Sequence, residues 1–159
     1  MESIKPEIDD IDLRIMALLQ EDGRLSIARL ADKLAMSETP VWRRVKRLEE
    51  EGHIRGYRAE LDRRKLGYGL TVFVQIHMAD HTGHAPDRFE AAVRALPEVL
   101  SCHIISGQAD YLLTVLARDM DHYGEFVANT LRQLPGVTSL HSSMVIREIK
   151  ASASIPVGE

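Results

Sequence analysis

The sequence predicts an α+β protein with a helical N-terminal part and a C-terminal part in which strands and helices alternate. Three observations support this prediction. Three short amphipathic segments precede Gly52, the hydrophobic period changes from helical to alternating at Leu70, and residues 94–103 recur in modified form at 132–141. With 159 residues, the chain is long enough for two small domains.

Capping residues delimit the three N-terminal helices. Asp9 or Asp10 can cap the first, whereas Ser26 and Ser37 are placed to cap the second and the third. The third helix is expected to end near residue 51, because Gly52 readily takes the left-handed conformation that closes a helix. Only a short connection separates the second and third helices, which is typical of a helix-turn-helix.

A mixed segment follows these helices. Residues 53–61 are punctuated by glycine and predict one or two small strands, either a wing or a connector. From Leu70 to Met78, apolar and polar residues alternate, so we expect a long strand with one buried face. The domain boundaries predicted from these changes are 1–61 for the helical domain, 62–69 for a linker, 70–150 for the strand-containing domain and 151–159 for a frayed tail.

The C-terminal domain has the predicted order β-α-β-β-α-β. A helix opens at Pro86, strands are expected at 99–106 and 110–118, a second helix at about 121–134, and a last strand from Val137 to Lys150. The segments RALPEVLSCH (94–103) and RQLPGVTSLH (132–141) match at six of ten positions. Two related β-α-β halves predict a ferredoxin-like sandwich, with two helices on one sheet face and an open apolar face that suits a partner subunit.

Composition excludes several classes of protein. The net charge is −4, so no global positive field attracts nucleic acid. A single cysteine excludes a disulfide framework and a cysteine-based zinc finger. The acidic N-terminus has no signal-peptide pattern and no apolar stretch reaches 18 residues, so we expect a cytoplasmic protein without a membrane span.

The third helix is locally basic. Four of the seven residues at 41–47 are Arg or Lys, and these cations oppose the helix dipole in a way that a polyanion would offset. In a helix-turn-helix the third helix enters the major groove, where Arg43 and Arg47 suit guanine and Thr39 suits a base edge or a phosphate. Arg44 and Lys46 are expected to contact phosphates.

Two alternatives remain open at this helix. A basic run can be no more than a solvated charged face, and Trp42 can pack in the core as well as against DNA. The candidate DNA-binding residues are Ser37, Thr39, Pro40, Trp42, Arg43, Arg44, Lys46 and Arg47.

These motifs resemble a known family. The Lrp/AsnC (feast/famine) transcription regulators are similar in residues 11–57, IDLRIMALLQEDGRLSIARLADKLAMSETPVWRRVKRLEEEGHIRGY, and in LTVFVQI, SGQADYLLTVLARDM and LPGV, which together span nearly the whole chain. The resemblance implies a winged helix-turn-helix joined to a ferredoxin-like (RAM/ACT-like) domain for effector binding and oligomerisation. It also implies a DNA-binding regulator that is not an enzyme, senses amino acids or related metabolites, and forms dimers that assemble further, commonly into octamers.

The resemblance also indicates an effector site. Residues 106–111, SGQADY, are similar to the family's G-x-x-D-Y turn, which helps to form a pocket between dimers. Turn amides can bind a carboxylate and Asp110 an ammonium, although a plain hairpin turn in which Asp110 caps local amides is the alternative. By the same resemblance, Met120, Ser142, Ser143 and Met144 line the opposing wall. The candidate effector-binding residues are Gly107, Gln108, Ala109, Asp110, Tyr111, Met120, Ser142 and Ser143, and an amino-acid-like effector is the only small molecule expected.

Other chemistry-bearing residues fit simpler roles. His77, His81 and His84 would need to converge with a carboxylate such as Asp80 to hold a metal, so a solvated loop is preferred and no metal site is expected. Cys102 alternates with the apolar residues of its strand and is expected on the helix-facing side as a small buried residue. An enzymatic function would need a nucleophile or an acid/base pair, and the sequence shows no such arrangement. An RNA-binding sheet would need exposed aromatic residues, which the segment YLLTVLAR does not provide.

Overall fold

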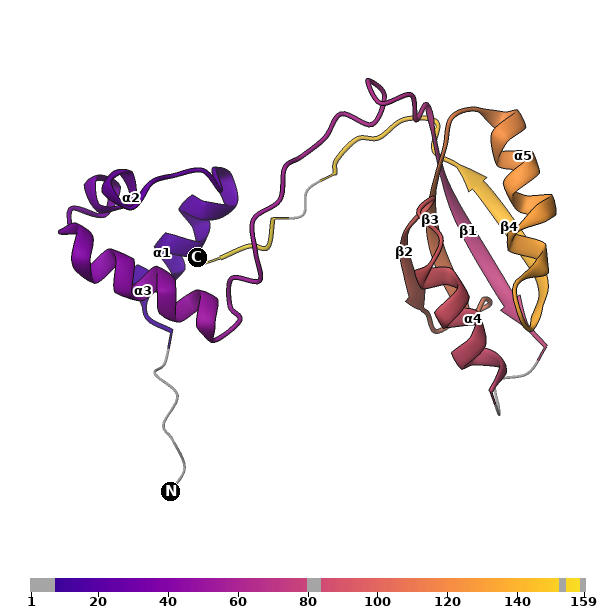
Figure 1. Ribbon diagram of the computed structural model, residues 1–159, viewed down its shortest axis with the longest axis horizontal. Coiled ribbons are helices and arrows are strands. Elements are labelled where there is room, and N and C mark those ends of the chain that lie inside the picture. Colours follow the sequence, from indigo (N-terminus) through magenta and orange to yellow (C-terminus); the bar gives the residue numbers. More distant parts are fainter. Residues whose placement is uncertain (1–7, 80–83, 152–153, 158–159) are drawn as a thin grey trace. The chain divides into compact units, whose positions relative to one another are not determined.

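The computed structural model describes residues 8–79, 84–151 and 154–157 (Figure 1). The chain forms two compact units. The helical unit comprises Met1–Glu60 together with Lys150–Glu159, and the sheet unit comprises Leu61–Ile149. No helix in the described parts of the chain is both long and apolar enough to cross a membrane.

The helical unit contains α1 (Asp10–Glu21), α2 (Ile27–Leu34) and α3 (Glu38–Glu50). The Asp9 side chain accepts a hydrogen bond from the Asp12 amide at 2.9 Å, and the Asp12 side chain accepts one from the Asp9 amide, which makes a capping box. Ser26 caps α2 as expected. The three helices enclose a core of Ile15, Leu19, Leu30, Ala31, Leu34, Val41, Val45 and Leu48.

Two local predictions for this unit need correction. Ser37 is the N-cap residue of α3, as predicted, but its side chain makes no capping hydrogen bond. Residues 53–61 contain no strand, because no second extended segment pairs with them and the chain turns at Gly52 in the left-handed region (φ +77°). The segment is held by side chains instead. Ile54 packs on the helical core, and the Tyr57 hydroxyl donates to Glu49 at 2.9 Å.

The sheet unit has the predicted β-α-β-β-α-β order. Its elements are β1 (Leu70–Met78), α4 (Ala85–Arg94), β2 (Val99–Ile104), β3 (Tyr111–Ala117), α5 (Met120–Asn129), a 3-10 turn (Leu131–Gln133) and β4 (Val137–Met144). The strands follow the spatial order β2-β3-β1-β4, and all neighbours are antiparallel. Figure 1 shows α4 and α5 packed along this sheet.

The two faces of the sheet differ in burial. Val72, Val74 and Ile76 of β1 are fully buried with Phe89 of α4 and Leu113 of β3, so the core lies between sheet and helices. The open face is mixed rather than uniformly apolar. One of its rows crosses all four strands in register, and its members are His103, Leu112, Gln75 and His141.

Two strand predictions need correction. β4 ends at Met144 rather than at Lys150, because its partner β1 begins at Leu70 and the pairing ends with Val72 opposite Met144. In β2, a bulge between Val99 and Ser101 shifts the alternation, so the Leu100 side chain is 60% exposed instead of facing the helices. Cys102 does face the core, as expected.

The described part of the C-terminal tail belongs to the helical unit. The side-chain amide of Gln20 on α1 donates to the Ile155 carbonyl at 3.0 Å, and the Ile155 amide donates back to the Gln20 carbonyl oxygen at 2.7 Å. The expectation of a frayed tail is therefore wrong at this residue, because the glutamine amide pairs with the tail as a strand would.

Candidate nucleic-acid interface and effector region

One face of α3 is exposed. Thr39, Trp42, Arg43 and Lys46 lie on it, opposite the buried stripe of the helix, and we call these four residues the recognition surface. The Trp42 side chain is 51% exposed, which excludes core packing, and the Lys46 Nζ lies 5.3 Å from the centre of its ring. An exposed indole beside the Lys46 ammonium suits contact with deoxyribose, bases and phosphates.

The other two basic residues of α3 are used inside the helical unit. Arg44 Nη1 lies 2.7 Å from Asp9 Oδ2 and 2.8 Å from Asp12 Oδ1, and Arg47 Nη2 bonds Asp12 Oδ2. The Asp12 side chain is fully buried, whereas those of Arg44 and Arg47 are 26% and 29% exposed. We call these four residues the Asp12 cluster. It ties the first turn of α1 to the middle of α3.

The geometry corrects the expected orientation of Arg47. Helical spacing places its Cα near the face of Thr39 and Arg43, but its long side chain reaches sideways to the buried Asp12 carboxylate. Its Nε is also buried, without a hydrogen-bond partner in the part of the chain that the structure describes. Arg44 Nη1 likewise donates to two carboxylates, those of Asp9 and Asp12.

Local hydrogen bonds shift the pKa values in this cluster. Those from the Asp12 amide and from the Arg44 guanidinium hold the pKa of Asp9 below its ordinary value. Hydrogen bonds to Asp9 and Asp12 raise the pKa of Arg44. Asp9 and Arg44 are therefore both charged at neutral pH.

The turn between β2 and β3 is tightly built. Gly107 adopts φ +133°, which favours glycine. Asp110 Oδ2 accepts a hydrogen bond from the Met78 amide at 2.7 Å, and the Asp110 amide donates to the Ile76 carbonyl at 2.9 Å. Asp110 thus fixes the end of β1 to the turn, and the amide that its side chain caps lies 32 residues away in the sequence rather than within the turn.

The remaining candidate effector residues do not meet this turn within one chain. Tyr111 is the first of the seven residues of β3, whereas Met120 follows the end of that strand, so the length of the strand separates them by about 20 Å. The Ser142 hydroxyl lies 2.6 Å from that of Tyr123 on the helix side, and Ser143 pairs with Phe73. One subunit therefore carries two separate parts of the predicted site.

Only two of the three histidines considered as metal ligands lie in the part of the chain that the structure describes. His77 lies in β1 and His84 immediately precedes α4, whereas His81 and Asp80 lie outside the described residues. Within the residues that are described, no three His, Cys, Asp or Glu side chains are arranged to hold a metal.

Comparison with known proteins identifies the family. A model described as winged helix-turn-helix DNA-binding matches residues 8–55, and one described as the Lrp/AsnC ligand-binding domain matches residues 71–155. The chain belongs to the Lrp/AsnC family. It is a DNA-binding transcriptional regulator with a ligand-binding domain.

Individual Lrp/AsnC relatives match over almost their full length. The Bkd operon transcriptional regulator of Pseudomonas aeruginosa is 41% identical over 151 residues, which cover 95% of this chain and 99% of the relative. The DNA-binding transcriptional activator DecR of Escherichia coli is 39% identical, with 94% and 99% covered. A Neisseria meningitidis transcriptional regulator solved as a complex with L-Met superimposes with a TM-score of 0.91, at 39% identity, over 94% of this chain and 97% of that one.

Sequence reasoning missed one part of the Lrp/AsnC DNA-binding unit, the acidic half of the Asp12 cluster. Asp9 was recognised only as a possible cap, and Asp12 was not singled out. The signal was weak, because an Asp-x-x-Asp pair at a helix start also makes a capping box, and the arginines lie 32 and 35 positions away.

Proposed function

We propose that this regulator reads DNA with the recognition surface of α3 placed in the major groove. The exposure of Thr39, Trp42, Arg43 and Lys46 on one helix face carries this proposal. Arg43 offers paired donors to guanine, Lys46 offers charge to a phosphate, and Ser37 and Pro40 lie at the helix start near the DNA backbone. Arg44 and Arg47 contribute indirectly, because they hold α3 against α1 through the Asp12 cluster.

The single tryptophan makes this proposal testable without a label. Trp42 is the only Trp in the chain, so its fluorescence reports on α3 alone. Operator DNA should change the Trp42 emission at the same concentrations at which a labelled operator gains anisotropy. Arg43→Ala should shift both curves together, whereas Arg88→Ala, an exposed arginine of the sheet unit, should shift neither. An unchanged emission at full DNA saturation would contradict the proposal.

We also propose that the regulator works as a homodimer that assembles further, such as into an octamer. The open sheet face supports this, because Phe73 on it is 43% exposed and a second copy would cover it. A dimer would place two α3 helices about 34–36 Å apart on a pseudo-palindromic site. Sedimentation of Phe73→Asp, with circular dichroism as the folding control, should show smaller species. A wild-type protein that is monomeric at micromolar concentration would contradict the proposal.

An amino-acid-like effector is proposed at the turn Gly107–Tyr111, completed by Met120, Ser142 and Ser143 of a second copy. Their separation within one chain supports a shared site, as does the L-Met complex of the Neisseria meningitidis regulator. Thermal shift against the twenty amino acids and related sulfur metabolites tests this. A ligand at about 100 times its Kd should stabilise by about 2.7 kcal/mol. We propose no catalytic role for the protein and place it in the cytoplasm, with the DNA that it binds.

The turn variants need a stability control, because Asp110 also holds β1. Gln108→Ala changes an exposed turn residue without touching that hydrogen bond, so it should reduce the response to ligand while leaving the ligand-free melting temperature unchanged. Asp110→Ala should lower both. A normal response in both variants would place the effector elsewhere.

A further inference from the structure

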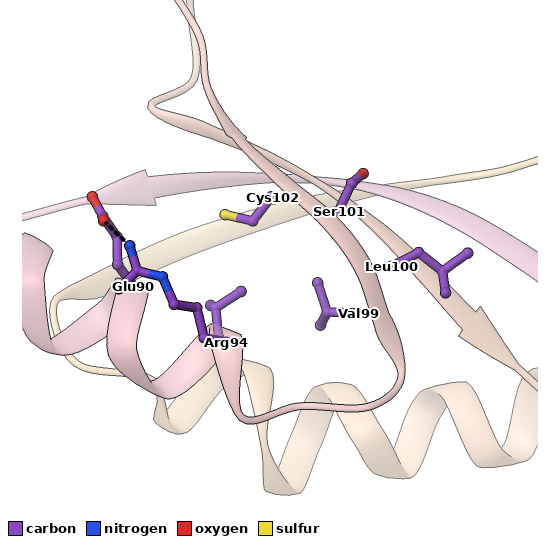
Figure 2. Close-up of a pocket in the computed structure, with 7 residues that line it drawn as sticks. Glu90, Arg94, Val99, Leu100, Ser101 and Cys102 are labelled. Carbon is purple, nitrogen blue, oxygen red and sulfur yellow. Dashed lines mark hydrogen bonds and ion pairs between the residues drawn. The ribbon is translucent and has the colours of Figure 1, made fainter. Parts of the chain in front are cut away.

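A pocket lies within the sheet unit, between α4 and β2 (Figure 2). Its volume is about 260 Å³, just below the ~300–1,000 Å³ typical of pockets for drug-sized ligands. Its lining residues are Glu90, Val93, Arg94, Val99, Leu100, Ser101 and Cys102. None of them belongs to the turn at 107–111.

One side of the pocket carries a pair of opposite charges. Glu90 Oε2 and Arg94 Nη2 lie 3.0 Å apart on successive turns of α4, as the dashed line in Figure 2 shows. Glu90 is oriented by the Tyr111 hydroxyl, which donates to Oε1 at 3.4 Å, and the Tyr111 ring in turn packs on Phe89 with centroids 4.5 Å apart. The Arg94 side chain is 74% exposed and has further N–H donors available to a ligand.

Apart from Ser101, whose hydroxyl donates to Thr114, the rest of the pocket is lined by apolar side chains and the Cys102 thiol. Val93 is buried, and Val99 and Cys102 pack against the core of the sheet unit. The bulge in β2 leaves Leu100 exposed beside them. Burial raises the pKa of the Cys102 thiol, with a further rise from the charge of Glu90 and an opposing effect of Arg94, so the thiol is neutral at pH 7 and near both charged groups.

We propose that this pocket binds a free amino acid with an apolar side chain inside a single subunit. A zwitterion matches the two charges, with its ammonium on Glu90 and its carboxylate on Arg94. Its side chain would lie against Val99, Leu100 and Cys102. This site is additional to the effector site proposed at the turn, and it needs no second copy of the chain.

Cys102 provides a site-specific readout, because it is the only cysteine in the chain. L-methionine at ten times its Kd should slow alkylation of Cys102 by iodoacetamide about tenfold, since only unoccupied protein reacts. L-methioninamide, which lacks the carboxylate, and N-acetyl-L-methionine, which lacks the ammonium, should protect far less.

Charge-removing variants test the assignment of the two groups. Glu90→Gln and Arg94→Gln keep the size of the side chains approximately, and each should weaken protection by about tenfold or more, because each removes a charged hydrogen bond. Asp87→Asn and Arg88→Gln make the same charge changes on exposed residues of α4 outside the pocket, and they should leave protection unchanged.

The outcomes separate this site from the one at the turn. If L-methionine raises the melting temperature without protecting Cys102, the pocket proposal fails and the turn proposal stands. If Cys102 is protected equally in the wild type, Glu90→Gln and Arg94→Gln, the proposed contacts are wrong. Protection that is lost in those two variants and retained in Gln108→Ala supports a separate pocket.

Discussion

The fully buried carboxylate of Asp12 on α1 accepts a hydrogen bond from Arg44 at 2.8 Å, across 32 positions of sequence, and it bonds Arg47 with its second oxygen. Two of the four cations in the basic segment of α3 thus form ion pairs inside the helical unit. Arg43 and Lys46 are exposed, and they supply the positive charge of the surface that we propose for DNA. On that proposal, stability and DNA recognition depend on different arginines of one helix.

Loss of the Asp12 carboxylate should destabilise the helical unit. Asp12→Ala leaves the Arg47 guanidinium without an anion and Arg44 paired with Asp9 alone, which is expected to cost about 1–3 kcal/mol in the free energy of unfolding. Urea unfolding followed by circular dichroism measures this change. Asp10→Asn removes an exposed carboxylate from the same turn and should stay within about 0.5 kcal/mol of the wild type. Equal stabilities of the two variants would show that the cluster contributes little.

Arg43 and Arg44 should respond differently to the same substitution. Arg43→Ala is expected to cost about 1–3 kcal/mol in operator binding and to relax base preference, with no change in unfolding. Lys46→Ala should weaken binding to all sequences and reduce the salt slope by about 1. Arg44→Ala should act mainly on stability. Binding isotherms on operator and random DNA test the set, and equal losses on both DNAs for Arg43→Ala would refute base reading.

Acid should weaken the helical unit through Asp9. Its pKa is lowered in the folded protein, so the carboxylate contributes stability above its ordinary pKa of 3.8, and this contribution is lost as the pH falls through the lower folded value. Asp9→Asn keeps a good helix cap and removes the titration. Melting temperatures measured from pH 5 down to pH 3 should fall more steeply for the wild type than for Asp9→Asn. Parallel curves would contradict this assignment.

Ala35 closes α2 in a left-handed conformation with φ +53°, which is unfavourable for a residue with a Cβ. Ala35→Gly should therefore stabilise the helical unit by about 0.5–1 kcal/mol. Ala28→Gly, at an exposed position inside the same helix, should instead destabilise it by about 0.5–1 kcal/mol. Thermal or urea unfolding of the two variants measures both changes in stability. A loss of stability in both would contradict the inference that Ala35 is strained.

Periodicity in the sequence correctly predicted the helices and strands that have one buried face and one exposed face. The alternation from Leu70 to Met78 is confirmed as β1, and the repeat containing His103 and His141 places both on the open sheet face. These predictions succeed because backbone geometry alone decides which way each Cβ points.

Features that depend on a distant partner were not predictable in this way. The end of β4 is decided by where β1 begins, and the exposure of Leu100 by a bulge. The direction of the Arg47 side chain depends on Asp12, since a long side chain moves its charge far from the position that helical spacing gives to its Cα. Helical spacing therefore identified the exposed residues of α3, but it also placed Arg47 with them, whereas the structure pairs the Arg47 guanidinium with the buried Asp12 carboxylate.

The two hydrogen bonds between Gln20 and Ile155 make the helical unit discontinuous in sequence. The chain leaves this unit after Glu60 and returns to it at Lys150, so the sheet unit is an insertion between its two pieces. A fragment that stops at Glu60 lacks part of that unit. An isolated version of the complete unit therefore needs residues 150–159 joined back to residue 60 through a short loop.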